Sequence, residues 1–179
     1  MGINVAEGTD RIKEQLGFDA ARLWRRWYAA CASAESNAGE NARLAELLTR
    51  AVHTPVSPQE AGRAEAALCA NDEEMAVEFV QKWLLTNAIA ELLERGVDGD
   101  VAIDVLDPFE RAELDLACGF VTVVVDGWRL RILYDMGCRD GLEDIVLPGD
   151  SASTPYDGWD PIDEMRPDAR DRLESLMMR

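Results

Sequence analysis

The chain has 179 residues, of which 35 are Asp or Glu and 18 are Lys or Arg, so its formal net charge is −17 at pH 7. Such an acidic chain is a poor candidate for direct nucleic-acid binding, which begins with cationic side chains that replace condensed counterions. Because 47% of the residues are hydrophobic and 30% are charged, we expect a folded globular protein and not a disordered acidic tail.

The sequence indicates a cytoplasmic protein. It contains no apolar run long enough to cross a membrane, and residues 1–8 have neither the basic stretch nor the apolar core of an export signal. We expect the cysteines to be reduced, since their spacing matches no zinc-ligand pattern and no C-x-x-C redox motif. They are Cys31, Cys69, Cys118 and Cys138.

From residue 9 to residue 96 the hydrophobic pattern is helical, because apolar residues recur three and four positions apart. We expect four helices, over residues 18–34, 40–53, 57–70 and 72–95. The last one has a broad apolar surface and is the best candidate for a central core helix. Gly96 is predicted to end it, because glycine favours the left-handed conformation that follows many helices.

After residue 96 the chain changes to short segments separated by Asp, Gly and Pro, so we place an organisational boundary near residues 97–100. Asp107-Pro108-Phe109-Glu110 has the residue types of a helix N-terminus and predicts a helix to about Cys118. Two β-rich runs, residues 120–125 and 128–134, are joined by Asp126-Gly127. This dipeptide favours a type I′ hairpin, whose two central residues both need positive φ.

A third strand is expected over residues 142–147, a loop over residues 148–160 and a final amphipathic helix over residues 167–178. We therefore predict an α+β fold. A helical N-terminal half, residues 1–96, would pack on a small antiparallel sheet, made of the hairpin 120–134 plus the third strand, with a C-terminal helix. The acidic second half, residues 97–179, would form one compact unit with the first.

The hairpin carries a resemblance. Residues 120–130, with the sequence FVTVVVDGWRL, are followed by Tyr134-Asp135 and by YDGWDP at residues 156–161. This arrangement resembles a family of small uncharacterised bacterial proteins that have a V-x-V-D-G-W hairpin and an aspartate-rich loop. The resemblance covers about the last third of the chain. It implies the fold of that part and implies no function.

The negative charge is uneven along the chain. Residues 1–60 contain 8 acidic and 7 basic residues, whereas residues 135–164 contain nine acidic residues and a single base, Arg139. We expect a strongly negative surface there, which serves either to keep the protein soluble or to bind a basic partner. The candidate partner-binding residues are Asp140, Glu143, Asp144, Asp150, Asp157, Asp160, Asp163 and Glu164.

No catalytic motif is present, so we expect the protein not to be an enzyme and to need no cofactor. The only histidine, His53, lies at the predicted end of a helix, where the helix dipole explains it. Residues 135–144 lack the carboxylate spacing of a calcium loop. A metal-dependent enzyme that uses the carboxylate cluster stays an alternative.

The leading functional hypothesis is a non-catalytic acidic protein that occupies a basic surface of another protein. A phage or mobile-element inhibitor of a nucleic-acid-processing complex, anti-CRISPR-like or a DNA mimic, is of this class. The alternative is an immunity protein that neutralises a basic toxin. We expect no direct contact with nucleic acid or membrane, and a homodimer is possible through the hairpin edge or the loop around Trp159.

Overall fold

The computed structural model describes residues 5–17, 19, 22–23, 45–46, 49, 55–58, 73–110 and 118–178. The chain divides into two compact units, residues 1–18 with 86–179, and residues 19–85. The helices predicted over residues 18–34, 40–53 and 57–70 lie largely outside the described residues, as do Cys31, His53 and Cys69.

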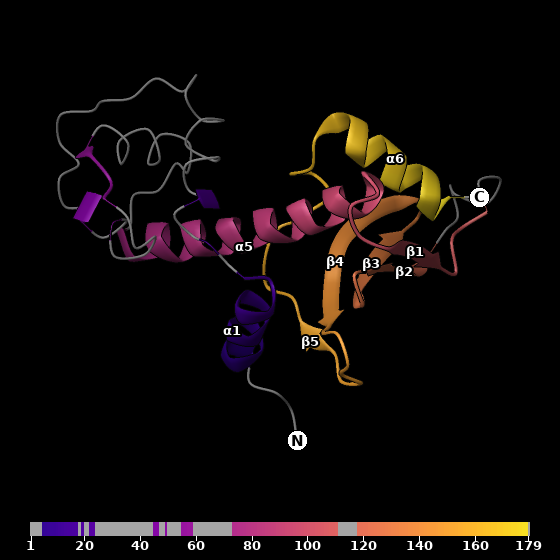
Figure 1. Ribbon diagram of the computed structural model, residues 1–179, viewed down its shortest axis with the longest axis horizontal. Coiled ribbons are helices and arrows are strands. Elements are labelled where there is room, and N and C mark those ends of the chain that lie inside the picture. Colours follow the sequence, from indigo (N-terminus) through magenta and orange to yellow (C-terminus); the bar gives the residue numbers. More distant parts are fainter. Residues whose placement is uncertain are drawn as a thin grey trace. The chain divides into compact units, whose positions relative to one another are not determined.

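A five-stranded antiparallel sheet organises this unit (Figure 1). Each strand pairs with the next one along the chain, so the strand order is β1-β2-β3-β4-β5. Together with the described helices, the sheet confirms the predicted α+β class. The strands are β1 (Ile103–Leu106), β2 (Gly119–Val125), β3 (Trp128–Asp135), β4 (Cys138–Val146) and β5 (Thr154–Pro155), and the helices are α1 (Val5–Gln15), α5 (Glu73–Val97) and α6 (Pro167–Met177).

Two tight turns connect the central strands. Between β2 and β3, Asp126 and Gly127 have φ angles of 48° and 81°, and Val125 pairs with Trp128 across the turn. Between β3 and β4, Met136 and Gly137 have φ angles of 50° and 78°. Two successive residues with positive φ give a turn whose twist matches that of the flanking strands. The sheet is larger than a hairpin with a third strand, because β1 and β5 extend it on both sides.

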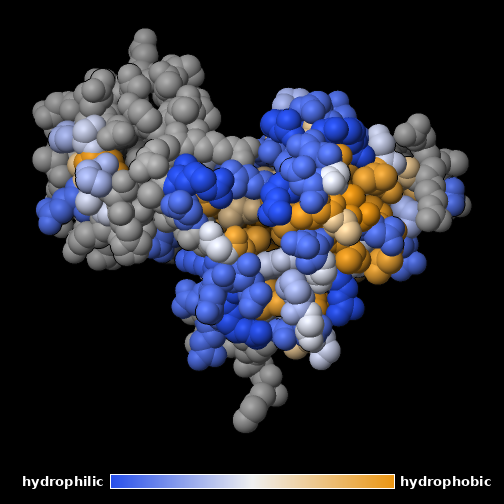
Figure 2. All heavy atoms as spheres, in the orientation of Figure 1, coloured by the Kyte–Doolittle hydropathy of each residue, from blue (hydrophilic) through white to orange (hydrophobic). Residues whose placement is uncertain are grey.

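One face of the sheet forms the core. Val121, Val123 and Val125 of β2 and Leu130 of β3 are completely buried, because residues two apart on a strand point to the same side. Helix α6 contributes Ala169, Leu173 and Met177, whose exposed fractions are all 0%. In the orientation of Figure 1, hydrophobic residues also reach the surface over β1, β2 and β3 (Figure 2). Among the described helices, none is long and apolar enough to cross a membrane.

The C-terminus of α5 differs from the prediction, because Gly96 lies inside the helix and not after it. The helix ends instead around Gly99, which has a φ of 85°. The Asp100 amide donates to the Arg95 carbonyl at 2.9 Å and the Gly99 amide donates to the Gly96 carbonyl at 3.0 Å, which is the hydrogen-bond pattern of a Schellman cap.

Gly96 has a packing role. A Cβ atom at this position would lie 2.9 Å from Val125 Cγ2 and 3.0 Å from Ile103 Cδ1. Only a residue without a side chain lets α5 approach β1 and β2 this closely. The glycine that sequence reasoning assigned to the helix end therefore serves the contact between helix and sheet.

The predicted helix start at residues 107–110 is wrong. Asp107 has a φ of 54°, and Phe109 forms an isolated parallel bridge with Met178. The Phe109 amide donates to the Met177 carbonyl at 3.0 Å, so this segment connects the sheet to the end of α6. Residues 111–117, where the rest of that helix was predicted, lie outside the described residues.

Gly96→Ala tests the packing role by the sign of its effect. Helix propensity alone predicts that alanine stabilises an α-helix by about 1 kcal/mol relative to glycine. Because the added methyl group would overlap Val125 and Ile103, we expect the free energy of unfolding to fall by about 1–3 kcal/mol. Urea unfolding followed by circular dichroism measures this difference. An unchanged or raised stability would show that the helix and sheet have room for a side chain.

Candidate functional site

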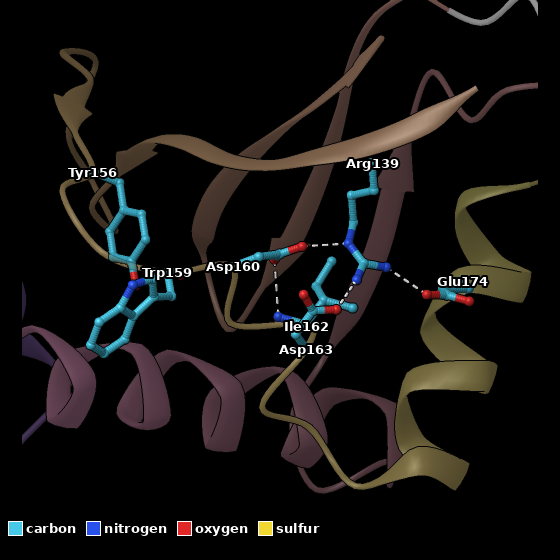
Figure 3. Close-up of polar contacts among 7 residues, drawn as sticks. All are labelled: Arg139, Tyr156, Trp159, Asp160, Ile162, Asp163 and Glu174. Atoms are coloured by element: carbon cyan, nitrogen blue, oxygen red, sulfur yellow. Dashed lines mark hydrogen bonds and ion pairs between the residues drawn. The ribbon is translucent and has the colours of Figure 1, made fainter. Parts of the chain in front are cut away.

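The loop that follows β5, here called the acidic loop (residues 156–165), is held against the sheet by Arg139 of β4. The Arg139 guanidinium donates from Nε to Asp160, from Nη2 to Asp163 and from Nη1 to Glu174 of α6, the last at 2.5 Å (Figure 3). We call these four residues the Arg139 cluster. It joins a strand, a loop and a helix that are separated by 21 to 35 residues in sequence.

The Arg139 cluster is only partly open to solvent. The side chains of Arg139 and Asp160 are 14% and 11% exposed, whereas Asp163 is 64% exposed. Burial disfavours the charge of Arg139, but the neighbouring carboxylates, first of all Asp160, outweigh this effect and raise the pKa of Arg139 above its usual value. The guanidinium therefore stays charged, and the cluster keeps a formal charge of −2.

A second anchor of the acidic loop is Tyr156. Its hydroxyl lies 2.7 Å from Thr86 Oγ1 of α5 and donates to the Trp159 carbonyl at 3.0 Å. The Trp159 amide donates to the same Thr86 hydroxyl at 3.2 Å. A Cβ atom at Gly158 would lie 2.2 Å from the Tyr156 hydroxyl oxygen, so glycine is required where the loop passes over the ring. Burial raises the pKa of Tyr156 well above its usual value.

Tyr134 of β3 lies beside the Arg139 cluster, since it pairs with Arg139 in the strand register. The residue is 2% exposed, and its hydroxyl has no hydrogen-bond partner among the described residues. Its ring packs edge-on against Phe109, with the ring centroids 5.2 Å apart. Burial raises the pKa of the Tyr134 hydroxyl. Because this hydroxyl has no hydrogen-bond partner among the described residues, the cost of burying it is not compensated.

Ion pairs hold the candidate residues Asp144, Asp150, Asp160 and Asp163. Asp160 and Asp163 belong to the Arg139 cluster. Asp144 pairs with Arg131 of the adjacent strand at 2.8 Å. Asp150 pairs with Arg11 of α1 at 2.5 Å.

These pairings change the charge balance of residues 135–164. The segment contains only one base, but Arg11 and Arg131 come to it from elsewhere in the chain. The local excess of negative charge is therefore smaller than the sequence suggests.

The other four residues lie along β4 and the acidic loop. Asp140, Glu143 and Asp157 are exposed, and Glu164 is half-buried. The Tyr156 amide donates to the Glu143 carbonyl at 2.9 Å, which places Asp157 next to Glu143. We call Asp140, Glu143 and Asp157 the acidic surface.

The acidic loop also closes onto β4 at a glycine. A Cβ atom at Gly141 would lie 3.6 Å from Asp160 Cβ, and Gly141 has a φ of 129°. Asp140 therefore lies between Arg139, which holds Asp160, and the glycine on which the same loop packs. The backbone at Asp140, Glu143 and Asp157 is therefore held in place by the contacts between β4 and the acidic loop.

The carboxylates of the Arg139 cluster surround a cation that belongs to the chain itself. Among the residues that the structure describes, no group of three His, Cys, Asp or Glu side chains is arranged to hold a metal ion. The carboxylates of the cluster converge on a guanidinium instead. Residues 135–144, which were compared with a calcium loop above, contain the last residue of β3, a two-residue turn and most of β4. Cys118 and Cys138 are exposed free thiols.

Sequence reasoning missed the residues that hold the site together. Arg139 was counted only as a lone base, and Glu174, Thr86 and Tyr156 were not among the candidates. The contacts of Arg139 and Thr86 join positions 21 to 73 residues apart, so no local spacing indicates them. The only local signal is the Tyr-Asp-Gly-Trp-Asp-Pro sequence of the loop, in which Gly158 marks a close approach.

Loss of the Arg139 guanidinium is expected to destabilise the fold. Arg139→Met leaves three carboxylates together without their cation, so we expect the free energy of unfolding to fall by about 2–3 kcal/mol. The matched control is Arg172→Met. Arg172 is 48% exposed and pairs with Asp98 and Asp168, so its loss should cost no more than about 1 kcal/mol. Equal losses for the two variants in urea unfolding would contradict a special role for Arg139.

We expect the substitution of tyrosine by phenylalanine to have opposite effects on stability at positions 134 and 156. Tyr156→Phe removes a hydroxyl with two partners and should lower the free energy of unfolding by about 1–2 kcal/mol. Tyr134→Phe removes a hydroxyl with no partner among the described residues and should leave stability unchanged or raise it by up to about 1 kcal/mol. Thermal unfolding of both variants measures the difference, and a larger loss for Tyr134→Phe would refute this assignment.

No family model, no curated protein and no solved structure matches the chain. The resemblance of the last third of the chain to small bacterial proteins with a V-x-V-D-G-W hairpin therefore stays a prediction.

Proposed function

We propose that this protein is a non-catalytic binding protein whose acidic surface occupies a basic surface of a protein partner. The observation that carries the proposal is the position of Asp140, Glu143 and Asp157. All three are exposed, and all three lie on β4 or on the loop that is fixed to it. The neighbouring carboxylates Asp160 and Asp163 serve to hold that loop.

Fixed carboxylates favour binding because less conformational entropy is lost when the complex forms. A mobile acidic loop would have to be ordered by its partner, which reduces affinity. Here the Arg139 cluster and the Tyr156 hydroxyl order the loop before any partner arrives. The surplus of negative charge would also speed encounter with a basic surface and set its register.

The partner that best fits this surface is a protein whose basic side chains normally contact phosphates. This mode of action is that of an inhibitor of a nucleic-acid-processing complex, anti-CRISPR-like or a DNA mimic from a phage or mobile element. The proposal includes a cytoplasmic location. The class is proposed by analogy of charge and size. Asp140, Glu143 and Asp157 would take the place of phosphates on the partner.

A charge-neutralised variant tests the proposal. In Asp140→Asn/Glu143→Gln/Asp157→Asn, the shape of the surface is kept while three negative charges are lost. We expect capture of basic proteins from a host lysate, quantified by mass spectrometry at low salt, to fall by roughly ten-fold or more. Capture by the parent chain should also fall in about 0.5 M salt, because exposed charges are then screened.

The matched control loses the same number of charges at other exposed positions of the first unit. It is Asp100→Asn/Asp107→Asn/Asp126→Asn, in which none of the changed residues belongs to β4 or the acidic loop. This control should capture the same proteins as the parent chain. Equal capture by the two triple variants, or capture that does not depend on salt, would contradict the proposed role of the acidic surface.

A further inference from the structure

The face of the sheet opposite the core, here called the outer face, carries a regular arrangement of side chains. Residues paired between antiparallel strands lie on the same face, so the register places Asp104, Val124 and Arg129 in one row across β1, β2 and β3. The next row contains Leu106, Thr122 and Arg131.

The outer face is apolar at its centre and open to solvent. Phe120 of β2 and Leu106 of β1 are each 42% exposed, whereas Val121 and Val123, which point to the core, are completely buried. The Arg131 guanidinium lies 4.1 Å from the centre of the Phe120 ring and leaves this ring partly exposed. Large apolar side chains exposed together on a sheet indicate an interaction surface.

The charges of the outer face are arranged in opposite signs about β2. Asp104 on β1 and Arg129 on β3 are both exposed and flank Val124 in the same row. Asp104 Oδ1 accepts the Val105 amide at 2.9 Å, which leaves the second carboxylate oxygen for another cation. One Arg129 nitrogen donates to the Asp150 carbonyl at 3.2 Å, but a guanidinium has five N–H donors.

We propose that the outer face is the interface of a homodimer in which the two-fold axis runs along β2. A rotation of 180° about this direction places β2 on β2 of the second copy and β1 on β3. Asp104 of each copy then meets Arg129 of the second copy, which gives two equivalent ion pairs. The central residues Phe120, Thr122 and Val124 meet their own counterparts, as an isologous interface requires.

The size of the face predicts the strength of the dimer. Strands lie about 4.8 Å apart and residues on one face repeat about every 6.8 Å, so three strands and two rows, with Phe120 beyond them, make a small contact. It is smaller than the ~800 Å² per partner of a standard stable interface. The dimer is therefore weak and forms only at high protein concentration. In it, the two sheets pack face to face with their strands aligned.

Edge-to-edge pairing through β1 is disfavoured by the same residue. The Val105 amide, which an added strand would need, already donates to Asp104. A side chain that occupies an outward amide protects an edge strand from pairing with another chain. The face of the sheet, and not its edge, is thus the surface offered to a second copy.

Charge exchange across the axis tests the proposal in the full chain. Sedimentation velocity over a range of concentrations gives the dissociation constant. Asp104→Arg and Arg129→Asp each place like charges together twice in the dimer, so each should raise this constant by roughly ten-fold. The double variant Asp104→Arg/Arg129→Asp restores two opposite-charge pairs and should return the constant toward that of the parent chain.

A second pair of variants separates the interface from folding and from overall charge. Phe120→Ser lies at the axis and should weaken the dimer without any change of charge, while Asp100→Arg, away from this face, should leave it unchanged. Circular dichroism checks that each variant is folded. A parent chain that stays monomeric at high micromolar concentration overturns the proposal. The proposal is also overturned if the double variant has a dissociation constant as high as that of the weaker-binding single variant, or if the dimer persists in Phe120→Ser.

Discussion

The guanidinium of Arg139 is the interaction on which the acidic part of the molecule depends. Asp160, Asp163 and Glu174 come from a loop and a helix, and without a cation between them their charges would repel. Because Arg139 lies on β4, it holds this loop against the sheet, and the Tyr156 hydroxyl holds the same loop at Thr86. A single base thus allows an acidic segment to have a defined shape.

The features that follow from neighbouring residues are those that the sequence indicates best. The positive φ angles of Asp126 and Gly127 follow from two residue types, and Pro167 suits the first turn of α6. Gly96 shows the limit of this reasoning. A glycine that ends a helix and one that packs against a sheet look the same in sequence, and only the contacts with Val125 and Ile103 distinguish them.

The candidate site was predictable in location but not in composition. The concentration of carboxylates between residues 135 and 164 is visible in the sequence, whereas their partners are not. Arg11 and Asp150 are 139 positions apart, and no pattern of residue types joins them. Asp144, Asp150, Asp160 and Asp163 are held in ion pairs that only the folded structure reveals.

The excess of negative charge determines which surface of this protein can bind a second copy and which can bind a basic partner. With a net charge of −17, two copies repel each other, so self-association requires a face on which charges balance locally. The outer face meets this condition because Asp104 is matched by Arg129. On the acidic surface of β4 and the loop, the charges do not balance locally. This surplus of negative charge disfavours a second copy and attracts a basic partner. The distribution of a few arginines, more than the total charge, thus separates the two kinds of contact.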